Sequence, residues 1–88
     1  MDLENNFNKQ DVKEKCESLG NKCYLSGLPL SLDNPDSYTF DHIIPVSKNG
    51  TNHLDNLGFA NPQINQMKGD LSVEEFINLC KIVTDYNT

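Results

Sequence analysis

The order of predicted elements between residues 38 and 69 constrains the fold of this chain more than any other feature. Tyr38-Thr39-Phe40 has the aromatic and β-branched content of a strand, and a second short strand is expected over residues 56–60. The polar, glycine-bearing stretch Ser47–Asn52 between them predicts a loop. A strand, a long loop and a second strand are therefore expected in that order.

A short helix is predicted to follow the second strand. Asn61 and Pro62 are typical of the N-cap and the first position of a helix, and Gly69 indicates its end. Asn65 and Lys68 are three residues apart on this helix and are expected to share a face.

Two further helices are predicted to flank this unit. Apolar residues recur at helical spacing over residues 8–19, and Gly20 offers a C-terminal stop. Ser72-Val73-Glu74-Glu75 has the pattern of a capping box at the start of a last helix. The apolar stripe of that last helix, which we expect to belong to the core, consists of Phe76, Leu79, Cys80 and Val83.

The length of 88 residues allows one small domain with a modest core, so residues 1–88 are taken as a single domain. Residues 23–30 are expected to form an extended stretch that folds back about Ser26-Gly27. Cys16, Cys23 and Cys80 are odd in number and irregular in spacing, which predicts neither a disulfide framework nor a structural zinc site. Reduced cysteines in the core are the expected alternative.

Other aromatic and histidine residues have ordinary expected roles. His53 lies in the polar loop region and is expected at the surface. The aromatic residues expected in the core are Tyr24, Phe40, Phe59 and Phe76.

The charge balance is unfavourable for autonomous binding to nucleic acid. The net charge is −6, and all seven basic residues are lysines spread along the chain. Binding to a phosphate backbone normally relies on clustered Lys and Arg, so any unaided grip on DNA is expected to be weak and sensitive to salt. The start of the chain lacks a signal-peptide pattern and no run approaches membrane-spanning length, which predicts a cytoplasmic protein outside the membrane.

Four polar residues are distributed over the predicted strands and helix in a way that suits a hydrolytic metal site. Asp41 and His42 follow the first strand, Asn56 begins the second, and Asn65 lies on the helix. Taken singly, the first two are an ordinary hydrogen-bonded pair at a strand end, Asn56 a capping amide and Asn65 a solvated helix residue. Their joint occurrence in this order favours a functional site.

This arrangement resembles the HNH endonuclease family and its ββα-metal fold, also called the His-Me finger. The likeness covers about residues 23–70 and is closest to the HNH nuclease domain of CRISPR RNA-guided nucleases and to small phage HNH proteins. The shared motifs are Cys23-Tyr24-Leu25-Ser26-Gly27, Asp41-His42-Ile43-Ile44-Pro45, Asp55-Asn56, and Asn65 with Lys68. The resemblance implies an α+β fold, a ββα core with one flanking helix at each end.

The resemblance also implies roles for the matched residues. His42 is expected to be the general base that activates water against a DNA phosphodiester, a task that suits a side chain titrating near neutral pH. Asp41 and Asn65 are expected to hold one divalent cation, Mg²⁺ with Mn²⁺ as a substitute, since both offer hard oxygen ligands. Asn56 is expected to hold the loop so that His42 is oriented for attack. Lys68 is a candidate contact to the substrate phosphate.

Two departures from the family pattern leave alternatives open. The paired zinc-binding cysteines of many HNH proteins are missing, so no structural zinc is expected. The acidic composition permits a second hypothesis, an HNH-fold module of a phage packaging or replication system that acts only with a partner protein and binds no DNA alone. A third hypothesis, a structural domain without catalysis, is disfavoured because every expected active-site position is filled.

Overall fold

The centre of the fold is a two-stranded antiparallel sheet. The computed structural model describes residues 8–88, in which β1 (Thr39–His42) pairs with β2 (Leu57–Ala60). Both predicted strands are confirmed, but β1 continues through Asp41 and His42, where the sequence predicted its end. Asp41 is therefore held in the pairing register, directly opposite Gly58.

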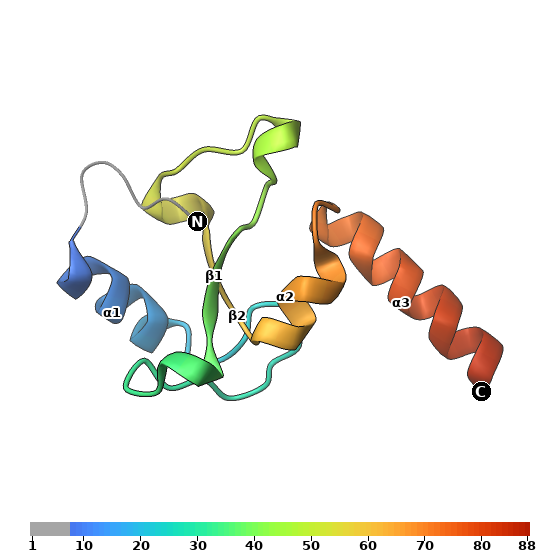
Figure 1. Cartoon of the computed structure of the whole chain (residues 1–88), viewed down its shortest axis with the longest axis horizontal. Helices are drawn as coiled ribbons and strands as arrows, with labels where there is room; N and C mark the ends of the chain where they lie inside the picture. Colours follow the sequence, from blue (N-terminus) through green and yellow to red (C-terminus); the bar gives the residue numbers. More distant parts are fainter. Residues whose placement is uncertain (1–7) are drawn as a thin grey trace.

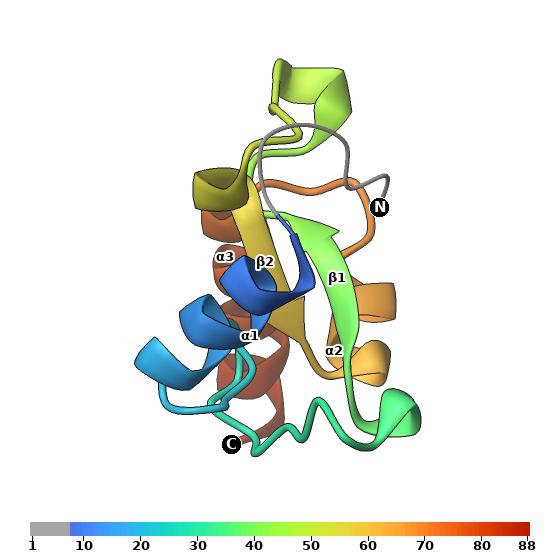
Figure 2. The ribbon, with the colours of Figure 1, turned by 90° about the vertical axis from the view of Figure 1, so that its left-hand side faces the viewer.

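The helix α1 (Lys9–Ser18) covers one face of this sheet, as Figure 1 and Figure 2 show. Its N-cap is Asn8, which forms a capping box with Asp11 and so satisfies two backbone N–H groups that the helix leaves free. The helix predicted over residues 8–19 is confirmed. Its buried residue is Cys16, which packs into the core.

The helix α2 (Pro62–Lys68) lies on the other side of the sheet from α1 (Figure 1). The Asn61 side chain caps it by accepting hydrogen bonds from two backbone N–H groups of the first turn, and a proline takes the first position, as predicted. Gly69 ends the helix with a φ of 53°, a conformation that a side chain disfavours. This short helix brings Asn65 and Lys68 to β1.

The last helix, α3 (Val73–Asn87), begins with the predicted capping box at residues 72–75 and extends away from the sheet (Figure 1). The prediction that its apolar stripe belongs to the core is wrong for most of its length. Phe76 is 8% exposed, whereas Leu79 and Val83 are 48% and 62% exposed. Hydrophobic periodicity identifies the apolar side of a helix, but it does not show whether another segment of the same chain packs against that side.

The core lies between α1 and the sheet. Of the four aromatic residues expected in the core, Phe59 is buried in it and Tyr24 and Phe40 are half-buried against it, whereas Phe76 is buried on α3 and does not belong to this cluster. The cysteines are free thiols. The buried members of the core are Cys16, Cys23, Leu30, Leu57, Phe59 and Ala60.

The segment 23–30 folds back about Ser26-Gly27, as predicted. The backbone N–H of Gly27 donates to the carbonyl of Cys23 at 2.9 Å, and Gly27 has a φ of 75°. Across residues 8–88, no helix has both the length and the apolar composition that crossing a membrane requires.

Candidate active site

Asp41 is the centre of the candidate site, because three side chains from other segments contact its carboxylate. Oδ2 accepts a hydrogen bond from the Tyr24 hydroxyl and lies 3.1 Å from the ammonium nitrogen of Lys68. The amide group of Asn65 lies 3.1 Å from Oδ1 and 3.3 Å from Oδ2. The structure therefore brings together Asp41, Asn65 and Lys68, which the sequence assigned to one site.

Lys68 lies one turn after Asn65 on α2, so both face Asp41, as their spacing predicted. The Lys68 side chain is 0% exposed and that of Asp41 is 13% exposed. Lys68 Nζ also donates to the backbone carbonyl of His42 at 3.5 Å. The ammonium group that was expected to contact a substrate phosphate is thus buried against Asp41 and is not presented to solvent.

His42, the last residue of β1, is oriented by a residue that the sequence did not single out. Its Nε2 lies 2.6 Å from the side-chain oxygen of Asn52 in the loop. An amide oxygen accepts hydrogen bonds, so this contact assigns the imidazole proton to Nε2 and leaves the lone pair on Nδ1. Asn52 belongs to the polar run that predicted only a loop, and no motif marked it.

Asn56 is buried where the loop meets β2, and all its side-chain bonds go to the loop backbone. Its Oδ1 accepts from the N–H of Ile44 at 2.8 Å, and its Nδ2 donates to the carbonyls of Ile44 at 3.1 Å and Thr51 at 2.8 Å. Side-chain amides that replace backbone partners in this way fix an irregular segment. The arrangement is the one expected for a residue that holds the chain after His42 in place.

Tyr24 was expected in the core, yet its hydroxyl binds the Asp41 carboxylate. Burial raises the pKa of the Tyr24 hydroxyl, and the hydrogen bond to Asp41 and its negative charge raise this pKa further. The phenol therefore keeps its proton and acts as a donor. The only sequence signal for this contact is Gly58, which lies opposite Asp41 and beneath the tyrosine ring.

The amide nitrogen of Asn65 faces Asp41 in the orientation that satisfies its hydrogen bonds, and a 180° rotation of the amide would put its oxygen there beside a divalent cation. The two groups lie 3.1 Å apart, and neighbouring ligands of an octahedral Mg²⁺ are about 3 Å apart. Tyr24 and Lys68 both contact Oδ2 of Asp41, which leaves Oδ1 toward Asn65. Within residues 8–88, no group of three or more His, Cys, Asp and Glu side chains gathers to hold a metal ion. The donor set is one carboxylate and one amide, with other positions left for water and phosphate.

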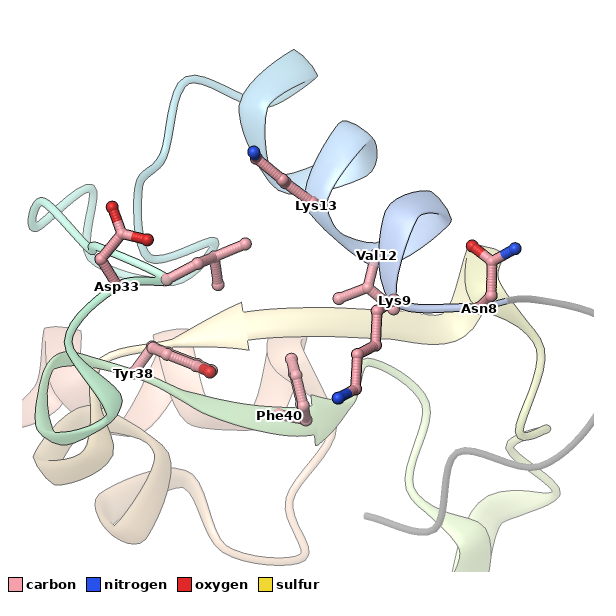
Figure 3. A pocket seen from close by; sticks show the side chains of 8 residues that line it. Asn8, Lys9, Val12, Lys13, Asp33, Tyr38 and Phe40 are labelled. Carbon is pink, nitrogen blue, oxygen red and sulfur yellow. The ribbon is translucent and has the colours of Figure 1, made fainter.

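A groove on the opposite face of the sheet, between α1 and β1, is separate from this site (Figure 3). Val12, Tyr38 and Phe40 supply its apolar lining, and Lys9 and Lys13 of α1 also line it. None of the predicted site residues does so. This groove therefore contains none of the residues with expected catalytic roles.

Two antiparallel strands joined by a long loop and followed by a helix, with Asp and His on the first strand, define an α+β protein with a ββα core. The sequence model of the HNH endonuclease family matches residues 14–71, more than half of the chain, and the chain belongs to this family. HNH domains are nucleases that act on DNA and generally depend on a divalent metal. A comparison with curated protein sequences gives no match.

Proposed function

We propose that this protein is a metal-dependent endonuclease that hydrolyses DNA phosphodiester bonds. The observation that carries the proposal is the approach of the Asn65 amide to 3.1 Å from Asp41, which is followed in β1 by His42 with its Nε2 bound to Asn52. Family membership supports nuclease activity in general.

In this proposal, His42 is the general base. The hydrogen bond from Nε2 to Asn52 orients the ring and leaves Nδ1 free to take a proton from water. The resulting hydroxide attacks the phosphorus atom, and the bond between phosphorus and the 3′ oxygen breaks. The charge that develops on the imidazole is stabilised by the Asn52 oxygen, which accepts from the protonated nitrogen throughout.

Asp41 and Asn65 are the proposed metal ligands, with Mg²⁺ as the ion and Mn²⁺ as a substitute. A divalent ion bound there supplies Lewis-acid stabilisation of negative charge on the phosphate and on the leaving 3′ oxygen. Asp41 offers Oδ1 because Oδ2 is bound by two donors. Asn65 offers its amide oxygen when the amide is turned toward that carboxylate.

Asn56 acts on catalysis through His42 and does not touch the reacting atoms. Its three hydrogen bonds hold Ile44 and Thr51, which lie on the two sides of the loop that carries Asn52. The expected contact of Lys68 with substrate phosphate stays a prediction. It requires Lys68 to leave its buried position on Asp41.

The composition favours a second candidate, action with a partner protein that supplies affinity for DNA. A net charge of −6 with seven lysines and no arginine opposes autonomous binding to a polyanion. In this version His42, Asp41 and Asn65 keep their roles, and the isolated protein binds metal but does not cut.

The test is incubation of the purified protein with supercoiled plasmid in the presence of Mg²⁺, Mn²⁺ or a chelator. We expect metal-dependent nicking that His42→Ala lowers by about 10²–10⁴-fold, the usual contribution of a general base. His53→Ala is the matched control, because His53 is an exposed histidine of the same loop region. It should retain wild-type nicking.

Undiminished nicking by His42→Ala, or nicking in chelator, would contradict the proposal. No nicking by a folded, metal-binding wild-type protein would favour the partner-dependent version. A pull-down and a salt-dependent DNA-binding assay on the same preparation would then distinguish a missing partner from weak affinity.

A further inference from the structure

We propose that Tyr24 is a positioning residue for the metal ligand Asp41. Its hydroxyl donates to Oδ2, and this contact leaves Oδ1, the oxygen nearer to Asn65 at 3.1 Å, free for a cation. The inference rests on the proposed function, in which these two residues hold the ion.

Tyr24 reaches Asp41 because its backbone is fixed against the edge of β2. Its N–H donates to the carbonyl of Phe59 at 2.9 Å. The neighbouring residue, Gly58, lies opposite Asp41 in the sheet. The tyrosine is therefore held next to the strand position that faces the carboxylate.

The absence of a side chain at Gly58 provides the space for the tyrosine ring. A Cβ atom on Gly58 would lie 2.6 Å from Cε1 and 2.9 Å from Cδ1 of Tyr24, closer than such atoms approach in proteins. The ring consequently lies over the backbone of β2 and extends its hydroxyl across to β1. The hydrogen bond from Tyr24 to Asp41 therefore depends on the glycine at position 58.

Two donors on the same oxygen restrict the rotation of the carboxylate. Tyr24 and Lys68 approach Oδ2 from different segments, and Lys68 lies at 3.1 Å. Rotation of the Asp41 carboxylate would break both contacts and leave a buried ammonium group without its counter-charge. The neutral hydroxyl adds a directional bond without adding charge, so Asp41 keeps the negative charge that attracts a cation.

The experiment compares Mn²⁺ binding by wild type, Tyr24→Phe and Tyr38→Phe, with free Mn²⁺ measured by electron paramagnetic resonance. Loss of a residue that orients a metal ligand typically weakens metal affinity 10–100-fold, so we expect the Kd of Tyr24→Phe to rise by about tenfold. Tyr38→Phe removes a hydroxyl on the opposite face, in the groove between α1 and β1, and should leave the Kd unchanged.

A melting curve without metal separates positioning from a structural role. A purely structural role would lower the melting temperature of Tyr24→Phe and leave the Kd of the folded variant at the wild-type value, which would overturn the proposal. Gly58→Ala, which displaces the ring, should raise the Kd in the same direction.

A second measurement observes Tyr24 in the unsubstituted protein, so it does not depend on the folding of a variant at position 24. With ¹³Cζ-labelled tyrosine, saturation with Mg²⁺ should shift the signal of Tyr24 and leave those of Tyr38 and Tyr86 in place. Tyr38→Phe and Tyr86→Phe assign the signals. An unmoved Tyr24 signal at saturation would overturn the inference.

The outcomes also separate this inference from the proposed function. Wild-type nicking and Mn²⁺ binding with an unchanged Kd for Tyr24→Phe would overturn the role of Tyr24 alone. A wild-type protein that binds no Mn²⁺ would overturn both.

Discussion

The two faces of the β1–β2 hairpin use neighbouring residues of the same strands for different purposes. On the α1 face, Phe40 and Phe59 pack edge to face with ring centroids 5.9 Å apart. On the α2 face, Asp41 lies opposite Gly58 and pairs with Lys68. Because side chains alternate along a strand, one step in sequence separates an apolar contact from a buried ion pair.

The difference shows how stability and chemistry are distributed. Apolar contacts contribute in proportion to the area they bury, so losing one has a limited effect. A buried charge depends on its partner, and removing the partner leaves it unsatisfied. The ion pair on the α2 face therefore couples stability to the candidate metal ligands, whereas the aromatic contacts on the α1 face contribute to stability alone. Unfolding free energy and Mn²⁺ affinity, measured on the same variants, test this contrast.

The largest loss of unfolding free energy and of Mn²⁺ affinity is expected for Asp41→Ala. The substitution leaves the ammonium group of Lys68, 0% exposed, without a counter-charge, and breaking one side of a buried pair typically costs about 3–5 kcal/mol. We expect the free energy of unfolding in urea to fall by that amount and Mn²⁺ binding to disappear.

The double variant Asp41→Ala/Lys68→Met tests the cause. It removes both charges, so most of the lost stability should return while Mn²⁺ binding stays absent. Asp85→Ala, at an exposed position of α3, is the control and should change stability by less than about 0.5 kcal/mol. If the double variant is no more stable than Asp41→Ala, the unpaired charge of Lys68 is not the cause of the lost stability.

A smaller loss of unfolding free energy is expected for Asn56→Ala. This residue lies in the loop, outside both faces of the sheet, and so extends the comparison to the segment that follows His42. Its removal leaves the backbone groups of Ile44 and Thr51 without their partners, at a cost of about 2 kcal/mol. Nicking should fall sharply because His42 loses its support, while Mn²⁺ affinity stays within twofold of wild type, about 0.4 kcal/mol. Equal losses of nicking and Mn²⁺ binding would place Asn56 among the determinants of the metal site instead.

The smallest effect is expected on the apolar face, for Phe40→Leu. This substitution removes two aromatic pairs, to Phe59 with planes at 74° and to Tyr38 with planes at 55°. At the low end of the usual range their geometry contributes about 1 kcal/mol together. Urea unfolding should shift accordingly, and Mn²⁺ affinity and nicking should remain at wild-type values. A change in Mn²⁺ affinity here would show that the two faces are not independent.

The starts of the helices were predictable because the residues at each start, close together in sequence, make the capping hydrogen bonds. Asn61 followed by proline starts α2, and residues 72–75 form the capping box of α3, both as their side chains indicated. The predicted strand stopped at Phe40, but pairing with β2 carries it two residues further, through His42. Strand length depends on the partner strand, and a segment read alone does not contain that information.

The contacts of the site were predictable only where one element supplies them. Asn65 and Lys68 share a helix, so their common face followed from spacing. Tyr24 reaches Asp41 from 17 residues away, through the backbone of β2 and the space above Gly58. The burial of Lys68 has the same origin, because its counter-charge belongs to a different element. Contacts between elements require the register of the sheet, which the sequence pattern leaves open.

Asn56 lengthens the sheet beyond its last strand pair. Its backbone carbonyl accepts from the N–H of Ile43 at 3.0 Å, and its side-chain amide both accepts from and donates to the backbone of Ile44. The first bond continues the antiparallel pairing by one residue, and the side chain bonds the next residue, whose backbone groups a regular facing strand would leave free. The two residues that follow His42 are therefore held to Asn56 where the loop leaves β1. A displacement of the loop is transmitted through them to the backbone of His42.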